Sequence, residues 1–275
     1  ARRRVGRWRS GDRRPVSTAI RRFGRAAWPP LAFGVGFLAI WELLVRVFDI
    51  QPFVLPAPTA IWSAFTVRFS EVFDQTLVTG TNALVGLLIG TFMGVVMSLI
   101  TVRFRLLEEL VTPLAVALNA VPIVVIVPVL NNMLFGTTSQ VPRRLMVALI
   151  VFFVVFVNVS KGLRQVSATH LELMRSYAAS SSAILLKVRV PNALGYLFTS
   201  LRISAPLAVI TAFVAEYFGG VQNGLATGVR SSLNGSKDVT WAYVIGASAL
   251  GLTFYMISVG LERLQRGKQP ADQFT

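Results

Sequence analysis

Six long apolar runs dominate the chain, and each is long enough to cross a membrane as a helix. A crossing needs roughly 20 mainly apolar residues at 1.5 Å per residue. Pro29 and Pro30 open the first run, where a first helical turn tolerates proline. The runs cover residues 28–48, 77–102, 110–135, 145–159 with its flanks, a segment within 193–218, and 239–261. The pattern predicts an all-α integral membrane protein with six transmembrane helices.

The composition agrees with a chain whose solvent is largely lipid. Of its 275 residues, 54% are hydrophobic and only 14% are charged, whereas soluble domains carry about 25% charged residues. There is no cysteine and a single histidine, His170, so we expect neither a metal site nor a Ser-His-Asp group. A phosphate-binding Gly-x-x-x-x-Gly-Lys-Ser/Thr motif is also absent. We therefore expect no enzyme and no cofactor in this chain, and any nucleotide energy must come from a partner.

The basic residues predict the orientation of the spans. The first 25 residues hold ten Arg against one acid, Asp12, and loops rich in Lys and Arg are typically cytoplasmic. Residues 1–27 are thus expected to form a cytoplasmic arm, and six crossings through residues 28–264 return the tail, 265–275, to the same side. Arg143 and Arg144 are a local exception in an outer loop. The arm is best interpreted as a solvated tail near anionic lipid rather than a nucleic-acid-binding face or a signal peptide.

An amphipathic pattern follows the first span. Three prolines within residues 52–58 favour an extended corner, and apolar residues then recur from Thr59 at steps of three and four. They are Ile61, Trp62, Phe65, Phe69, Val72 and Phe73. The segment is too short and too charged to cross, so we expect a helix lying on the outer surface, or one packed on its own outer loops.

The second and third spans carry different signals. Gly86, Gly90 and Gly94 recur every four residues in the second span, which favours close packing of a neighbouring helix over a direct role in a pore.

The third span contains three prolines, whose freed backbone carbonyls need partners. Two interpretations stay open: a solute pathway near a subunit interface, or amides that pair with the freed carbonyls. The pathway residues would be Asn119, Pro122, Asn131 and Asn132.

Few ionisable residues lie within the spans. Glu42 and Arg46 are four residues apart, a spacing that predicts a structural pair. Arg202 is close enough to the inner surface to extend its head group to water, and Glu216 lies near the outer end of the fifth span. We expect no charged pair at the membrane midplane. This argues against an ion-coupled secondary transporter, which remains an alternative together with a non-transporting scaffold.

The loop between the fourth and fifth spans, about residues 165–192, carries a helical pattern. Leu171, Met174 and Ala178 share one helical face. The serines at 180–182 predict a break and a new N-cap, and Pro191 should end the run that follows. The pattern predicts two short helices at an angle. A partly apolar surface of this kind is typical of a docking element.

The same loop resembles the shared cytoplasmic loop of permease subunits of bacterial ABC importers, which reads Glu-Ala-Ala, three residues, Gly, nine residues, then Ile-x-Leu-Pro. Here Glu172-Leu173-Met174 occupies the triplet, Ala178 the Gly position, and Val188-Arg189-Val190-Pro191 the end. Residues 201–203, 214–219 and 55–58 also look like the nitrate, sulfonate and taurine branch. The resemblance covers roughly residues 28–264.

The resemblance implies a type I ABC importer-like permease in a bacterial inner (plasma) membrane, with both termini cytoplasmic. Its loop would be a coupling helix seated on cytoplasmic ATPase subunits, which would bind ATP and Mg. A second permease chain would complete the pathway, and an external solute-binding protein would deliver the solute; no nucleic acid is involved. The implied coupling residues are Glu172, Met174, Arg175, Ala178, Val188, Val190 and Pro191. The branch suggests nitrate, sulfonates, taurine or heterocycles such as vitamin precursors as solutes.

Ala178 departs from the family pattern. Alanine in place of glycine removes the freedom to adopt a positive φ and adds a methyl group at the bend, while Leu173 and Met174 are larger than the family's small residues. We therefore expect altered docking. One hypothesis is that the chain forms a heterodimer with a permease carrying the regular motif, rather than a homodimer.

Overall fold

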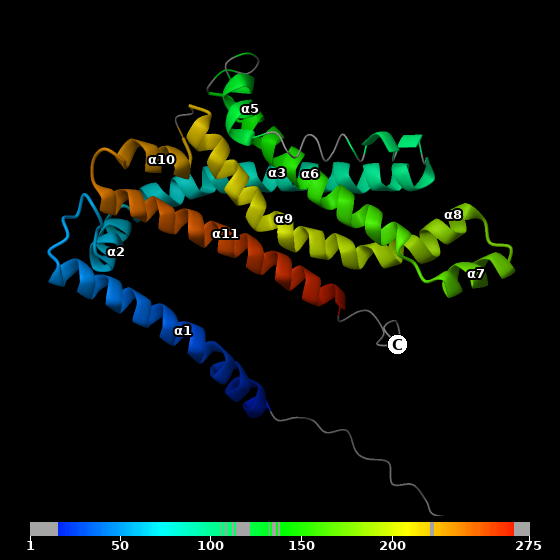
Figure 1. The fold of residues 1–275 in the computed structure, drawn as a ribbon, viewed down its shortest axis with the longest axis horizontal. Coiled ribbons are helices and arrows are strands. Elements are labelled where there is room, and N and C mark those ends of the chain that lie inside the picture. The colour runs from blue at the N-terminus through cyan, green and yellow to red at the C-terminus, as the bar shows by residue number, and fades with distance from the viewer. Residues whose placement is uncertain are drawn as a thin grey trace, which may run out of the picture. The chain divides into compact units, whose positions relative to one another are not determined.

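The structure is a computed structural model that describes residues 16–104, 106–107, 109–111, 113, 122–131, 133, 136, 138–220 and 223–266. Its elements are helical (Figure 1). In chain order they are α1 (Val16–Val47), α2 (Pro58–Val67), α3 (Phe69–Arg103), α5 (Ile123–Leu130), α6 (Val141–Arg164), α7 (Ala168–Ser176), α8 (Ser181–Ile184), the π-helical turn η2 (Leu185–Arg189), α9 (Val190–Phe218), α10 (Leu225–Ser232) and α11 (Lys237–Arg266). The chain divides into two compact units, Ala1–Thr59 and Ala60–Thr275.

Five helices in the described residues are long and apolar enough to cross a membrane. They are Trp28–Val47, Phe69–Arg103, Val141–Arg164, Ser181–Phe218 and Lys237–Gln265, and they correspond to the first, second, fourth, fifth and sixth predicted spans. Most of the third predicted span, including Asn119 and Asn132, lies outside the described residues, and α5 is the helix described within it. An all-α, multi-span membrane protein is thus confirmed.

The first unit contains α1, which begins earlier than expected. Pro29 and Pro30 lie inside this helix rather than in its first turn, because the helix begins at Val16 and continues through the prolines. The predicted pair is confirmed: Arg46 lies 2.6 Å from the carboxylate of Glu42. Glu42 also accepts hydrogen bonds from the backbone N–H and the hydroxyl of Thr59, at 3.1 and 2.8 Å. The end of α1 is therefore tied to the start of α2 by side-chain contacts within this unit.

The predicted surface helix is divided between two helices. It breaks at Arg68, so that Ile61 and Phe65 belong to α2 while Phe69 and Val72 open the long helix α3. Val72 is buried against residues of α10 and α11 instead of facing a surface. The segment forms two helices rather than one, and the burial of Val72 against α10, which lies between the fifth and sixth predicted spans, agrees with the alternative of a helix packed on its own loops.

The core of the second unit is a row of three helices, with α6 between α3 and α9 and with α11 packed on α9 (Figure 1). Small residues bring α3 and α6 close together. A methyl group at Gly86, Gly90 or Gly94 would lie 2.4–2.9 Å from the nearest atom of α6. At Gly90 that atom is the backbone carbonyl oxygen of Ala148, which cannot move without bending the helix. Glycine at these positions therefore permits direct contact between two backbones.

The fifth predicted span is longer than expected. Helix continues from Ser181 to Phe218, through α8, η2 and α9, so Pro191 does not end the run as predicted. Pro191 occupies the first turn of α9, directly after the π-turn, where the N–H of Val190 bonds the carbonyl of Leu185. A proline ring clashes with the carbonyl four residues before it in an α-helix, and the wider turn relieves that clash.

Candidate functional site

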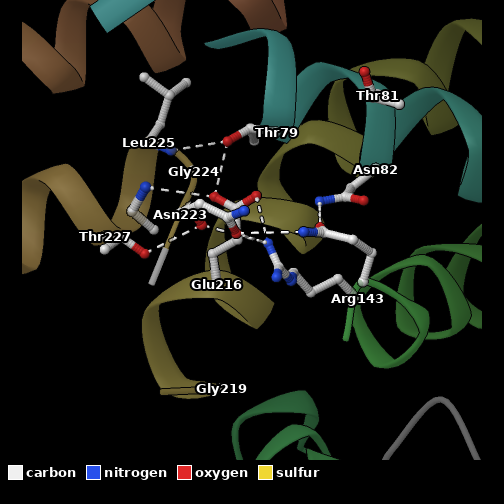
Figure 2. A network of polar contacts seen from close by, with 12 residues as sticks. Thr79, Thr81, Asn82, Arg143, Glu216, Gly219, Asn223, Gly224, Leu225 and Thr227 are labelled. Atoms are coloured by element: carbon white, nitrogen blue, oxygen red, sulfur yellow. Dashed lines mark hydrogen bonds and ion pairs between the residues drawn. The ribbon is translucent and has the colours of Figure 1, made fainter. Parts of the chain in front are cut away.

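A polar cluster lies where α6 begins and α9 ends. Its side chains come from α3, the residues at the start of α6, the end of α9 and the segment before α10 (Figure 2). We use the name polar cluster for Thr79, Asn82, Gln140, Arg143, Arg144, Glu216 and Asn223. Arg143 and Glu216 at its centre are both fully buried. The sequence placed Arg143 in an outer loop, whereas the structure places it in the first turn of α6.

Glu216 is held by hydrogen bonds and one cation. Its Oε2 accepts from the hydroxyl of Thr79 at 2.8 Å and from the backbone N–H of Ala226 at 3.5 Å, while Oε1 lies 3.9 Å from Nη1 of Arg143. Thr79 in turn accepts from the N–H of Leu225 at 2.9 Å. A buried charge is costly unless it is paired and hydrogen-bonded, so these contacts explain how a carboxylate can lie here.

Arg143 connects the cluster to the segment before α10. Its Nη1 donates to Oδ1 of Asn223 at 3.0 Å, and the amide of Gln140 donates to the same oxygen at 3.4 Å. On the other side, Asn82 donates to Gln140 at 2.7 Å and accepts from Arg144 at 3.0 Å. Four parts of the chain, distant in sequence, are thereby joined by one chain of hydrogen bonds (Figure 2).

Gly224 shows how closely the segment before α10 approaches this cluster. Its φ is +105°, a value that L-residues rarely adopt, and a methyl group there would lie 2.3 Å from the carboxylate of Glu216. Its N–H donates to the side chain of Gln75. The carboxylate therefore packs directly on backbone, which leaves no room for another residue type.

Asn131 and Pro122 are the two predicted pathway residues that the structure describes. The amide of Asn131, which is buried, donates to the carbonyl of Gly219 at the end of α9. This contact matches the alternative in which amides satisfy carbonyls near helix ends. Pro122 is exposed and precedes the first turn of α5. The two residues are not brought together with the polar cluster by any contact among the described residues.

The loop after α6 lies at the other end of that helix, which is 24 residues and thus about 36 Å long. We use the name loop corner for α7, the turn at residues 177–180, α8 and η2. Of the two predicted short helices, α7 is separate, whereas the second is continuous with α9 through α8 and η2. The predicted N-cap is confirmed at Ser180, whose hydroxyl accepts from the N–H of Ala183 at 3.2 Å. No residue of α7, α8 or η2 is buried.

The turn of the loop corner retains the shape of a glycine turn although it has an alanine. Ala178 has φ +50°, so the expectation that alanine excludes a positive φ was wrong. Its N–H bonds the carbonyl of Arg175 at 2.9 Å, and the N–H of Ala179 bonds that of Met174 at 3.0 Å. This pair of bonds defines a Schellman motif, which normally places glycine at this position. The hydrogen bonds that close α7 compensate the strain of the left-handed residue.

The predicted coupling residues lie along this loop corner and its junction with α9. Glu172 and Arg175 are exposed on α7, Met174 is half-buried, Val188 is half-buried in η2, and Val190 and Pro191 open α9. Large apolar side chains are also exposed: Leu173 by 51%, Tyr177 by 75% and Leu186 by 67%. Exposed apolar area beside charged groups is typical of a surface that a partner covers.

A second ion pair joins the spans near the loop corner. Nη1 of Arg202 in α9 lies 3.2 Å from the carboxylate of Glu262 in α11, while 42% of the Arg202 side chain stays exposed. Arg202 is therefore paired across helices and also partly exposed, as the sequence predicts. No group of three or more His, Asp or Glu residues that could hold a metal occurs in the described residues.

The sequence reasoning missed the Arg143–Glu216 pair. A signal for it existed: Arg143 and Arg144 lie on the side that is poor in basic residues, and Glu216 lies close to the end of a span on that same side. Because buried charges are rare unless they are paired, that exception could have been interpreted as two halves of one contact.

Comparisons with known proteins agree with this arrangement. The formylaminopyrimidine transport permease protein ThiX of Halalkalibacterium halodurans is 31% identical over 195 residues, covering 70% of this chain and 76% of ThiX. The aliphatic sulfonates transport permease protein SsuC of Escherichia coli is 28% identical over 247 residues, covering 88% and 92%. A crystal structure of an amino acid ABC transporter with histidines has a similar fold, with a TM-score of 0.61, 16% identity, and coverage of 72% of this chain and 96% of that one.

A family match covers most of the second unit, including the polar cluster except Thr79 and Asn82, and the whole loop corner. Residues 86–267 match the family described as the binding-protein-dependent transport system inner membrane component. The matched segment is well over half of the chain and contains four of the five described spans in whole or in part. The chain therefore belongs to the family of inner membrane components of binding-protein-dependent transport systems.

Proposed function

We propose that this chain is the permease subunit of an ATP-driven ABC importer, and that the loop corner is its contact with the ATPase. The observation that carries the proposal is an unburied helix pair at the position of the family's coupling loop. This helix pair exposes large apolar side chains beside Glu172 and Arg175. Such a surface is costly to leave in water, and a cytoplasmic ATPase would cover it.

Continuity of the helix after the loop corner supports a mechanical role. Helix runs without interruption from Ser181 to Phe218, 38 residues or about 57 Å. A displacement of α8 by a partner would therefore act directly on a membrane span. The far end of this helix is held by Glu216 in the polar cluster, so motion at one end is coupled to packing at the other. Transport requires two discrete arrangements of the helices, and a rigid element of this length can connect them.

The coupling residues divide by chemistry. Glu172 and Arg175 would make polar contacts with the ATPase, because both are charged and exposed on α7. Met174, Ala178 and Val188 would pack against it. Val190 and Pro191 would connect the contact surface to α9, since they form its first turn. The left-handed turn at Ala178 sets the angle between α7 and α8 and thereby the shape of the contact surface.

The remaining parts of the importer follow from membership of the family. Two cytoplasmic ATPase subunits would bind ATP and Mg, a second permease chain would complete the pathway, and an external binding protein would deliver the solute. The six spans would place both termini in the cytoplasm of a bacterial cell. Asn119, Pro122, Asn131 and Asn132 are proposed for the pathway. The loop turn keeps its glycine-like shape, which favours a second copy of this chain as the partner over a heterodimer.

The test is reconstitution of the complete transporter with its ATPase and binding protein. Glu172→Lys should reduce solute-stimulated ATP hydrolysis severalfold while insertion into the membrane stays intact. Asp74→Lys, which also reverses an exposed charge but lies near the start of α3, is the matched control and should retain hydrolysis. Unchanged hydrolysis in Glu172→Lys would contradict the assigned contact.

Two further measurements separate this function from its alternatives. Uptake in cells that lack the ATPase but keep their ion gradients should be absent; persistent uptake would indicate an ion-coupled transporter, and no uptake in any condition would indicate a scaffold. Purification with native partners followed by mass spectrometry identifies the solute held by the binding protein. The names of ThiX and SsuC point to a heterocycle and to sulfonates respectively, so both classes belong in that search.

A further inference from the structure

A cavity of about 250 Å³ lies beside the loop corner, where α3 ends. Three of its lining residues are arginines that come from different elements: Arg103 from the end of α3, Arg175 from α7 and Arg189 from η2. Ser181 adds a hydroxyl group, and Val102 and Leu185 form an apolar wall. The cavity is thus lined by three positively charged residues and by an apolar wall, and it lies at the end of a membrane span.

The three guanidinium groups have no partners within the described part of the chain. None of them forms a hydrogen bond or an ion pair there, in contrast to Arg143 and Arg202. A cavity of this volume is about 8 Å across if it is spherical, which is no more than the Debye length of about 8 Å at physiological ionic strength. Arg103 and Arg175 are exposed and Arg189 is half-buried, so three like charges line one cavity, and a bound anion would reduce their mutual repulsion.

The shape and position of the cavity indicate which anion fits. A guanidinium group binds phosphate oxygens through two parallel N–H donors, and three such groups can surround one phosphate. Basic pockets between transmembrane helices on the cytoplasmic side bind anionic lipid head groups. The wall formed by Val102 and Leu185 suits the glycerol and acyl part of a lipid, since it is apolar and adjoins the end of a span.

We propose that Arg103, Arg175 and Arg189 form a binding site for a phosphate group, supplied by the head group of an anionic phospholipid or by a free phosphate. An occupied site would connect the end of α3 to both arms of the loop corner. It would hold α7 in place relative to the span, so the bound phosphate would regulate how firmly the loop corner is anchored. The site shares Arg175 with the proposed ATPase contact, but its occupancy is measured without the ATPase, so the two proposals can fail separately.

The test uses the purified full chain and the variant Arg103→Gln/Arg189→Gln, which leaves Arg175 in place. Native mass spectrometry in detergent micelles containing phosphatidylglycerol counts bound lipid, with phosphatidylcholine as the neutral comparison. A separate titration with inorganic phosphate, followed by the line width of its ³¹P resonance, measures the free anion. We expect the variant to bind phosphatidylglycerol at least tenfold more weakly. Arg263→Gln, an exposed arginine near the end of α11, should bind as the wild type does.

The outcomes distinguish the sources of the phosphate. Loss of lipid binding in the double variant, with no effect of inorganic phosphate on the wild type, supports a lipid head group. Loss of phosphate binding supports a free anion. Equal binding by wild type and double variant in both arms overturns the proposal. If the glutamine variant does not yield folded protein, Arg103→Lys/Arg189→Lys replaces it: charge without the paired donors should weaken binding severalfold, and unchanged binding would again count against the site.

Discussion

The two ends of α6 differ in whether the polar residues around them are buried or exposed. At its start, the polar cluster buries Arg143 and Glu216 and joins them to each other, to Thr79, to Asn223 and to the backbone N–H of Ala226. At its end, the loop corner buries no residue of α7, α8 or η2 and leaves charged and apolar side chains exposed. The polar groups of one end contact one another inside the chain, whereas those of the other end lie at the surface.

This difference indicates that the polar cluster contributes to the stability of the fold and that the loop corner contributes to binding. Contacts in the polar cluster join segments far apart in sequence, so removing one of them should weaken the fold. Residues of the loop corner have few internal contacts, so removing one should leave the fold intact and change only what binds to it. The four predictions that follow test this division, and the largest expected effect comes first.

Arg143→Met should destabilise the protein by about 3–5 kcal/mol, because it leaves the Glu216 carboxylate buried without a cation. Thermal or denaturant unfolding of the purified chain in detergent, followed by tryptophan fluorescence, measures the loss. In Arg143→Met/Glu216→Gln the charge is removed while the hydrogen bonds to Thr79 and Ala226 can remain, so most of the stability should return. A double variant as unstable as the single one would show that the ion pair is not what holds this end together.

Gly90→Ala should cost about 1–3 kcal/mol through overpacking, because the new methyl would lie 2.4 Å from the carbonyl oxygen of Ala148 in α6. The matched control is Gly251→Ala in α11, where a methyl would meet no atom within 4 Å. The same unfolding measurement applies to both. If the two variants had the same free energy of unfolding, the close approach of α3 and α6 would not contribute to the stability of the fold.

Ala178→Gly should stabilise the turn of the loop corner by about 1 kcal/mol or less, because glycine relieves a left-handed residue. Ala179→Gly provides the contrast: its φ is not positive, so glycine there should only add freedom to the unfolded chain and lower stability slightly. Hydrogen exchange of the amides in residues 168–184 reports the change locally. If both variants changed the local hydrogen exchange in the same direction, the interpretation of Ala178 as a strained residue would be wrong.

Leu173→Ser should change the free energy of unfolding by no more than about 0.5 kcal/mol, since its side chain is 51% exposed. The amount of ATPase that co-purifies with the chain should nevertheless fall, because apolar contact area is lost. Val67→Ser, at an 81% exposed position at the end of α2, should leave the ATPase bound. A Leu173→Ser variant that unfolds readily would show that the loop corner is part of the stable fold after all.

The sequence predicted the parts of this fold that depend on local patterns. Apolar runs located five described spans to within a few residues for most ends, because a membrane crossing imposes a minimum apolar length. The Gly86, Gly90 and Gly94 spacing pointed to close packing, and the Ser180 cap was identified from residue type. The loop corner was recognised because its residues follow one another along the chain.

Other features were not predicted, because residue type alone does not show how the neighbouring backbone or a distant helix accommodates a residue. Pro191 would end an isolated helix, yet the π-turn before it absorbs the clash. Val72 belongs to an amphipathic stripe, but it is buried by α10 and α11 and not by a surface. Ala178 keeps a glycine-like φ because the hydrogen bonds of the Schellman motif hold it there.

The sequence by itself therefore determined that this is a helical membrane protein of a transport family, with an exposed loop suited to a partner. Each of those properties can be assigned from residues close together in the chain. Tertiary structure alone decided that Arg143 meets Glu216 and that three arginines share one cavity. The physical reason is that the effect of a charge on stability or binding depends on its neighbours in space. Arg143 and Glu216 are 73 positions apart in the sequence, and Arg103 and Arg189 are 86 positions apart.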